Sequence, residues 1–199
     1  MQHLQTLESY LDECGHTSKV IDVLAHFAPQ RGLDAGEMFE EFSKYHMVRN
    51  SGASRGGQLD WNKKQIELHA ELLISGREEH RDQTLLHETA HLIIILLYPE
   101  SRFKHSRIKA HGREWKTVMR QLGCRPDREC DYDFLHEARA KKANIIYACQ
   151  HCDHEFPAQR RWKNVESKYH PKCGRKLGRL YIKRDVTGRT YPSPSKVAA

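Results

Sequence analysis

The sequence predicts an α+β fold in which helices pack with a small antiparallel sheet and a compact C-terminal unit follows. Three observations support this prediction. Apolar residues recur at helical spacing before residue 45 and again over residues 83–97. Short runs that alternate apolar and polar residues lie over residues 45–70, where glycines separate them. Cysteine and histidine pairs with the spacing of metal ligands lie over residues 149–173.

Length and composition indicate a soluble protein. The 199 residues suffice for one or two domains with a sizeable core, and 38% hydrophobic with 30% charged residues is ordinary soluble composition. The longest apolar run, Leu92 to Tyr98, is too short to cross a bilayer, and the N-terminus lacks the features of a signal peptide. Six cysteines, three of them in a metal-like cluster, favour bound zinc in a reducing compartment. We therefore expect a cytoplasmic location and no membrane partner.

The net charge of +7 is distributed unevenly along the chain. Residues 1–100 carry 9 basic and 16 acidic side chains, whereas residues 101–199 carry 24 basic and 10 acidic ones. A positive half of this kind is the electrostatic signature of a polyanion binder. The alternative is a solvated surface whose charges serve solubility.

Three helices are expected before the sheet. Helical spacing covers residues 4–13 and 18–28. A third helix is expected to begin near Asp34, which forms a capping box with Glu37. Nothing in these helices indicates chemistry, and residues 1–36 are assigned to a separate N-terminal segment.

Three short strands are expected next, over residues 47–49, 58–61 and 65–70. Glycines and an Asn-Lys-Lys corner separate these runs, as turns separate antiparallel strands. The edge of such a sheet could accept an extended peptide by strand addition.

Residues 83–97 are expected to form a helix, capped by Asp82 or Thr84, that carries a His-Glu-x-x-His pattern. Residues four apart share one face of a helix, so His87 and His91 can bind one metal ion. Glu88, about 100° around the helix, can reach a metal-bound water without being a ligand. This is the geometry of a zinc hydrolase with Glu88 as its catalytic residue. The alternative is a pair of core or surface histidines.

A further helix is expected to start near His111, because positions 111, 115, 118, 119 and 122 share one apolar face that ends before Gly123. A catalytic zinc has three protein ligands and an open position for water. His111 is therefore predicted to be the third ligand. Glu114 is the second choice, and His105 is weaker because basic residues surround it. A histidine satisfied within the core is the alternative role of His111.

Two further ligand pairs define the C-terminal unit. The predicted ligands of a structural zinc are Cys149, Cys152, His170 and Cys173. Two pairs with two intervening residues each, beside turn residues, match a zinc ribbon, whose closed site stabilises a unit too small to build its own core. His151 and His154 lie nearby but do not recreate the paired spacing. A redox role for the first cysteine pair competes with this interpretation but leaves the second pair unexplained.

The ribbon combines basic and aromatic side chains. The basic ones are Arg160, Arg161, Lys163, Lys168, Lys172, Arg175, Lys176 and Arg179. The aromatic ones are Phe156, Trp162, Tyr169 and Tyr181. Cations for phosphates and exposed rings for stacking favour binding of a single-stranded nucleic acid. Phe156 and Tyr169 are expected to form the small core of the ribbon, and the role of Trp162 is left open. Residues 184–199 are expected to be a disordered tail.

The order of these elements resembles the SprT family, which includes bacterial SprT proteins and eukaryotic Spartan DNA–protein crosslink proteases. The resemblance covers roughly residues 37–180. It rests on the His-Glu-x-x-His helix, on the segment His111-Gly112-Arg113-Glu114-Trp115-Lys116 and on the ribbon. It implies a zincin-like metalloprotease core over residues 37–146, followed by a zinc ribbon over residues 147–183.

The resemblance also implies the roles of individual residues. His87, His91 and His111 would hold a catalytic zinc, Glu88 would be the catalytic residue, and a DNA-bound or DNA-crosslinked protein would be the substrate. Two departures stand out, since His170 replaces a cysteine usual in the family and the loop between the second and third histidines is long. The alternative function is a non-catalytic, zinc-containing nucleic-acid-binding or regulatory protein, against which the intact carboxylate argues.

Overall fold

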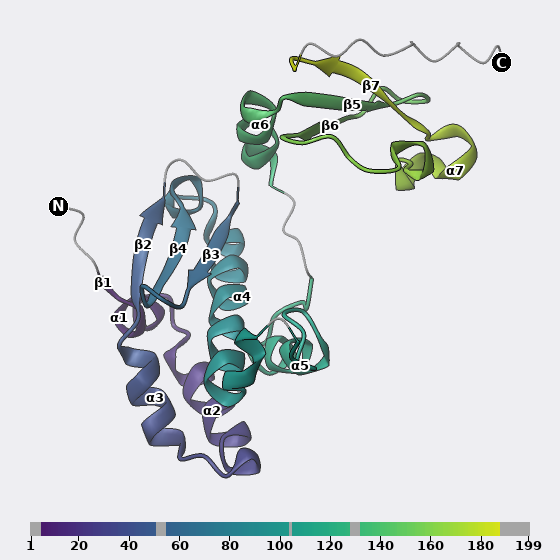
Figure 1. The fold of residues 1–199 in the computed structure, drawn as a ribbon. Helices are drawn as coiled ribbons and strands as arrows, with labels where there is room; N and C mark the ends of the chain where they lie inside the picture. Colours follow the sequence, from purple (N-terminus) through teal and green to yellow (C-terminus); the bar gives the residue numbers. More distant parts are fainter. Residues whose placement is uncertain (1–4, 51–54, 104, 128–131, 188–199) are drawn as a thin grey trace. The chain divides into compact units, whose positions relative to one another are not determined.

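The computed structural model describes residues 5–50, 55–103, 105–127 and 132–187 (Figure 1). The chain divides into two compact units, Met1–Asp131 and Tyr132–Ala199. The first contains a four-stranded sheet and most of the helices, and the second contains a three-stranded sheet. This mixture of helices and small sheets confirms the predicted α+β class at that level.

The first unit begins with three helices, α1 Leu7–Glu13, α2 Thr17–Phe27 and α3 Ala35–Ser43. All three were predicted from the sequence. Asp34 caps α3, and its carboxylate accepts a hydrogen bond from the amide of Glu37 at 2.9 Å. The apolar side chains of α1 and α2 belong to the same hydrophobic core as the helix that carries the histidine pair. They are Leu7, Leu11, Val20, Val23 and Leu24.

The sheet of the first unit has the strand order β1-β2-β4-β3. Its strands are β1 Gln5–Thr6, β2 His46–Asn50, β3 Gly57–Asp60 and β4 Gln65–His69. The three predicted strands are confirmed, and β1 adds a short fourth one.

The predicted antiparallel sheet is wrong for one pair, because β2 and β4 are parallel. The chain leaves β2 and forms β3 at the outer edge, then turns back so that β4 fills the place between them. Burial explains this order, since Ile66 and Leu68 of β4 are fully buried and a central strand is covered best.

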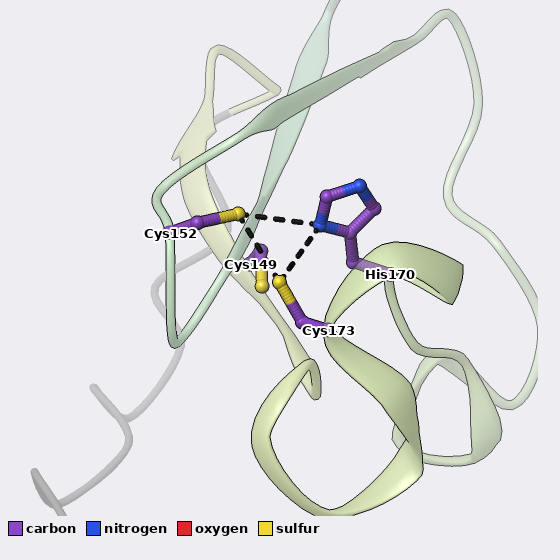
Figure 2. A group of neighbouring side chains, drawn as sticks. All are labelled: Cys149, Cys152, His170 and Cys173. Carbon is purple, nitrogen blue, oxygen red and sulfur yellow. Dashed lines mark hydrogen bonds between the residues drawn. The ribbon is translucent and has the colours of Figure 1, made fainter.

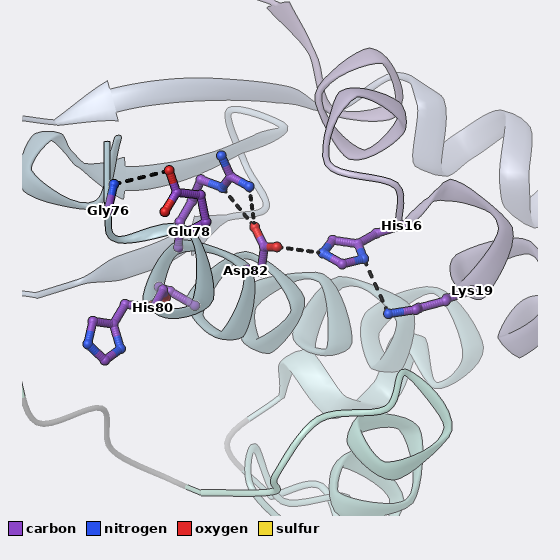
Figure 3. Close-up of polar contacts among 8 residues, drawn as sticks. His16, Lys19, Gly76, Glu78, His80 and Asp82 are labelled. Carbon is purple, nitrogen blue, oxygen red and sulfur yellow. Dashed lines mark hydrogen bonds and ion pairs between the residues drawn. The ribbon is translucent and has the colours of Figure 1, made fainter. Parts of the chain in front are cut away.

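The helix α4, Glu78–Leu97, starts five residues before the predicted start at residue 83. Neither predicted cap is used. The hydroxyl of Thr84 donates to the carbonyl of His80 at 2.9 Å. The carboxylate of Asp82 lies 3.2 Å from Nε2 of His16 and so joins α4 to the turn before α2 (Figure 3). The two side chains that the sequence predicted as caps therefore make other contacts, Thr84 within the helix and Asp82 with His16.

The helix α5, Arg113–Gln121, begins just after His111, and Gly112 occupies its N-cap. The apolar face predicted for this helix is confirmed, since Trp115, Val118, Met119 and Leu122 are buried. Gly123 ends the helix in the left-handed conformation, with φ +78°.

The second unit contains α6 Asp133–Lys142, a sheet of order β6-β5-β7, and the short helix α7 Gly174–Leu177. The antiparallel strands are β5 Ile145–Cys149, β6 Glu155–Ala158 and β7 Leu180–Asp185. Because β7 extends to Asp185, the predicted tail begins inside a strand. Its remainder, residues 188–199, lies outside the described residues. Short 3-10 turns occupy Pro29–Arg31, Ala70–Leu73, Pro99–Arg102, Val165–Ser167 and Pro171–Cys173.

Within the part of the chain that the structure describes, no helix combines the length and apolar character needed to cross a membrane.

Deletion of residues 1–36 is expected to prevent the first unit from folding, because it removes six buried side chains from the shared core. Truncating a single buried leucine costs ~2–5 kcal/mol, a large part of a typical stability of ~5–15 kcal/mol. Circular dichroism and thermal unfolding measure the effect, with Leu24→Ala as a graded control. Cooperative unfolding of the truncated chain at the temperature of the full chain would contradict this expectation.

Candidate metal centres

Three imidazoles from two segments converge in the first unit. His87 and His91 lie one turn apart on α4, and His111 lies just before α5. The Nε2 atom of His91 is 3.2 Å from that of His87 and 3.1 Å from that of His111, and the third side of the triangle is 3.3 Å. The structure therefore brings together the three predicted ligands, in a group that could hold a metal ion.

The triangle has the dimensions that a zinc site requires. A tetrahedral zinc with Zn–N bonds of ~2.0–2.1 Å places its nitrogen ligands ~3.3 Å apart. Burial, together with the smaller effect of the neighbouring histidines, lowers the pKa of His87 to about 4 and that of His91 to about 3. Both imidazoles are therefore neutral near pH 7, the form that binds metal.

Trp115 supports all three imidazoles from the core. Its fully buried ring lies 4.8 Å from the rings of His87 and His111 and 5.4 Å from that of His91, between ring centres. The sequence placed Trp115 on the apolar face of α5 but did not indicate this contact. The sequence signal for this contact was that Trp115 follows His111 by four residues, a spacing that predicts one shared helix face.

Glu88 follows His87 directly on α4 and is itself buried. Burial raises the pKa of its carboxyl to about 7, although the amide of Leu59 and the charge of Arg55 act in the opposite direction. One carboxylate oxygen accepts a hydrogen bond from the Leu59 amide at 3.0 Å. A carboxyl with this pKa can accept and release a proton near neutral pH.

The two other candidates for the third ligand do not join the triangle. The carboxylate of Glu114 forms an ion pair with the guanidinium of Arg113, and the oxygen and nitrogen atoms are 3.4 Å apart. Neither Glu114 nor His105 belongs to the groups of potential ligands that occur among the described residues.

A second group of ligand atoms lies in the C-terminal unit (Figure 2). It consists of Cys149, Cys152, His170 and Cys173, whose ligand atoms all lie within 4.8 Å of one another. Nδ1 of His170 is 3.2 Å from the sulfur of Cys152 and 3.2 Å from that of Cys173. The ring of His154 stacks on His170 at 5.0 Å without joining the group. Four sulfur and nitrogen donors of this kind suit a closed zinc site.

The aromatic residues of the ribbon divide into two groups. Phe156 and Trp162 pack against the small core formed around Tyr147. The Trp162 ring lies parallel to that of Tyr147, with 4.5 Å between the ring centres. The ring of Tyr169 lies under the guanidinium of Arg175, at 5.5 Å. The core role expected of Phe156 is confirmed, whereas the one expected of Tyr169 is not, because Tyr169 is not among the residues that pack in this core.

Comparison with known proteins shows what this chain is similar to. The SprT-like family model matches residues 35–136, just over half of the chain. Protein SprT of Pseudomonas paraeruginosa is 32% identical over 107 residues, which are 53% of this chain and 61% of that protein. Protein SprT of Yersinia pestis is 25% identical over 169 residues, which are 83% of this chain and 92% of that protein. The chain thus spans less than two thirds of the Pseudomonas relative.

His111→Ala is expected to lower the zinc content from two ions per chain to one, because two imidazoles cannot replace the three that converge. Mass spectrometry of the metal in purified, folded protein measures the loss. His105→Ala is the matched control, since it removes a histidine from the same loop and should leave both ions in place. Two tightly held ions in His111→Ala would show that the triangle is not a zinc site.

Proposed function

Because the chain belongs to the SprT-like family, we propose that it is a zinc-dependent metalloprotease of the SprT type with a zincin-like core. One observation carries the proposal: three imidazoles converge on α4, where the residue that follows the first of them is a buried carboxylate outside the ligand group. A purely structural zinc site has no use for such a carboxylate. This observation favours an enzyme over a non-catalytic regulatory protein.

The proposed mechanism assigns a role to each residue of the first site. His87, His91 and His111 would hold the zinc, whose chemistry when bound is to activate a water and to polarise the scissile carbonyl. Glu88 accepts the proton of the attacking water and returns it to the leaving amine. Trp115 keeps the three imidazoles in place, because its ring contacts each of them.

The substrate would bind along the free edge of the four-stranded sheet. That edge is β3, which lies beside α4 (Figure 1). An extended peptide added to this edge would run past Glu88 and pair with main-chain groups of β3 other than the Leu59 amide, which is bonded to Glu88.

We further propose that the second unit binds DNA. The substrates would then be proteins that are bound or crosslinked to that DNA. Its eight ribbon cations, from Arg160 to Arg179, are all exposed. The ammonium of Lys168 lies over the ring of Trp162, at 5.5 Å from its centre. Charge of this density beside an aromatic ring supports contact with phosphates and bases. Cys149, Cys152, His170 and Cys173 would hold a second, structural zinc. A cytoplasmic location stays a prediction.

Glu88→Gln is expected to keep both zinc ions and to slow proteolysis at least ~100-fold, because the amide can accept the Leu59 hydrogen bond but cannot accept a proton. The assay incubates a DNA-bound protein with the wild type or the variant, with and without DNA and chelator. His105→Ala serves as the active control. Undiminished cleavage by Glu88→Gln would refute the catalytic role of this carboxylate.

Replacing Lys168, Lys172 and Lys176 together by Gln is expected to weaken single-stranded DNA binding. Each phosphate contact contributes ~0.7 to the slope of log affinity against log salt, so the slope should fall by about 2. Fluorescence anisotropy across a salt series measures both quantities. The matched control neutralises three lysines of the first unit, Lys44, Lys63 and Lys64, which are paired with carboxylates. Equal slopes for the ribbon variant and the wild type would exclude the ribbon as the DNA site.

A further inference from the structure

The backbone of β3 contacts the side chain of Glu88 directly. In an antiparallel ladder, residue pairs alternate between exchanging two hydrogen bonds and exchanging none. The amide of His69 donates to the carbonyl of Gly56 at 2.8 Å, so Gly57 and Leu59 direct their N–H groups away from β4. The Leu59 amide donates instead to the carboxylate of Glu88 at 3.0 Å. An edge amide that could pair with another strand is thus used to hold a side chain of α4.

Gly57 is the point where β3 approaches α4 most closely. A methyl group at Gly57 would lie 2.7 Å from Cγ2 of Thr84, 3.0 Å from Cγ of Glu88 and 3.2 Å from its Oε1. Carbon atoms in ordinary contact are ~3.5–4.0 Å apart. Thr84 is buried, and its hydroxyl is bonded to the carbonyl of His80, so its methyl group cannot easily move away. The strand and the helix can meet here because residue 57 has no side chain.

This close approach decides where the carboxylate lies. Thr84 and Glu88 are four residues apart on α4 and share one face, which contacts β3. Any group that pushes β3 outward at residue 57 also moves the amide of Leu59, two residues along the same strand. The hydrogen bond to Glu88 then lengthens, or the carboxylate rotates away from the histidines.

We propose that Gly57 and the Leu59 amide are positioning groups that hold the Glu88 carboxylate beside the three histidines. Gly57 permits the approach of β3 to α4, and Leu59 makes the contact. Both act through Glu88. This inference rests on the proposed function, because it concerns the group to which proton transfer is assigned.

Amide hydrogen exchange in the full chain tests the contact without any reaction. The Leu59 N–H points away from the ladder, so its protection depends on Glu88. Glu88→Ala and Gly57→Ala are both expected to speed exchange at Leu59 about tenfold or more, because a charge-assisted hydrogen bond is lost. Exchange at Ile66 in the neighbouring strand should not change. Gly36→Ala is the matched control, since it adds the same methyl group to an exposed helix position, where its nearest neighbour is Oδ1 of the exposed Asp34 side chain at 3.0 Å.

Turnover supplies the second readout. Gly57→Ala, loaded with two zinc ions per chain, is expected to cleave the DNA-bound protein about tenfold to a hundredfold more slowly, through kcat with KM unchanged. Adding Thr84→Ser removes the methyl carbon nearest the new side chain and keeps the hydroxyl. This double variant should recover part of the Leu59 protection and part of the turnover.

Each outcome decides the proposal. Wild-type exchange at Leu59 in Gly57→Ala overturns it, and so does wild-type turnover by the zinc-loaded variant. If Gly57→Ala does not fold, the double variant with Thr84→Ser carries the same comparison. If the wild type cleaves no protein, the proposed function fails, whereas the exchange rates still decide whether β3 holds Glu88.

Discussion

The central constraint on the first unit is the burial of polar side chains on α4. His87 and Glu88 lie inside a hydrophobic core, where polar groups destabilise the fold unless they have partners. The helix meets this requirement on two sides. The side toward α5 places the imidazoles against Trp115 and His111, and the side toward the sheet places Glu88 against the Leu59 amide. The packing of one helix therefore sets both the candidate metal site and the surroundings of the Glu88 carboxylate.

The strand order has a direct consequence for this site. Because β4 fills the centre of the sheet, β3 remains at the outer edge and its backbone reaches α4. A simple antiparallel meander would have placed β3 between β2 and β4, where both edges of its backbone would be occupied by ladder hydrogen bonds. The parallel pairing of β2 with β4 is thus what leaves an amide available for Glu88.

The two ligand groups differ in a way that separates their proposed roles. The ribbon offers four donors, Cys149, Cys152, His170 and Cys173, which can complete a tetrahedral shell. The first unit offers three imidazoles, so a zinc held there would keep a position for water. His170 in place of a thiolate makes the ribbon site less negative, in a unit whose exposed surface is strongly basic.

The sequence by itself determined the elements and most of the candidate ligands, because these follow from local spacing. His87 and His91 share a helix face, and the ribbon pairs sit in tight turns, whatever the remaining chain does. Tertiary structure alone decided that His111, and not Glu114 or His105, joins the other two histidines. It also decided the early start of α4, the direction of β4 relative to β2 and the contact between Leu59 and Glu88. Each of these depends on residues distant in the sequence, whose approach is set by core packing, and periodicity along the chain does not encode such pairings.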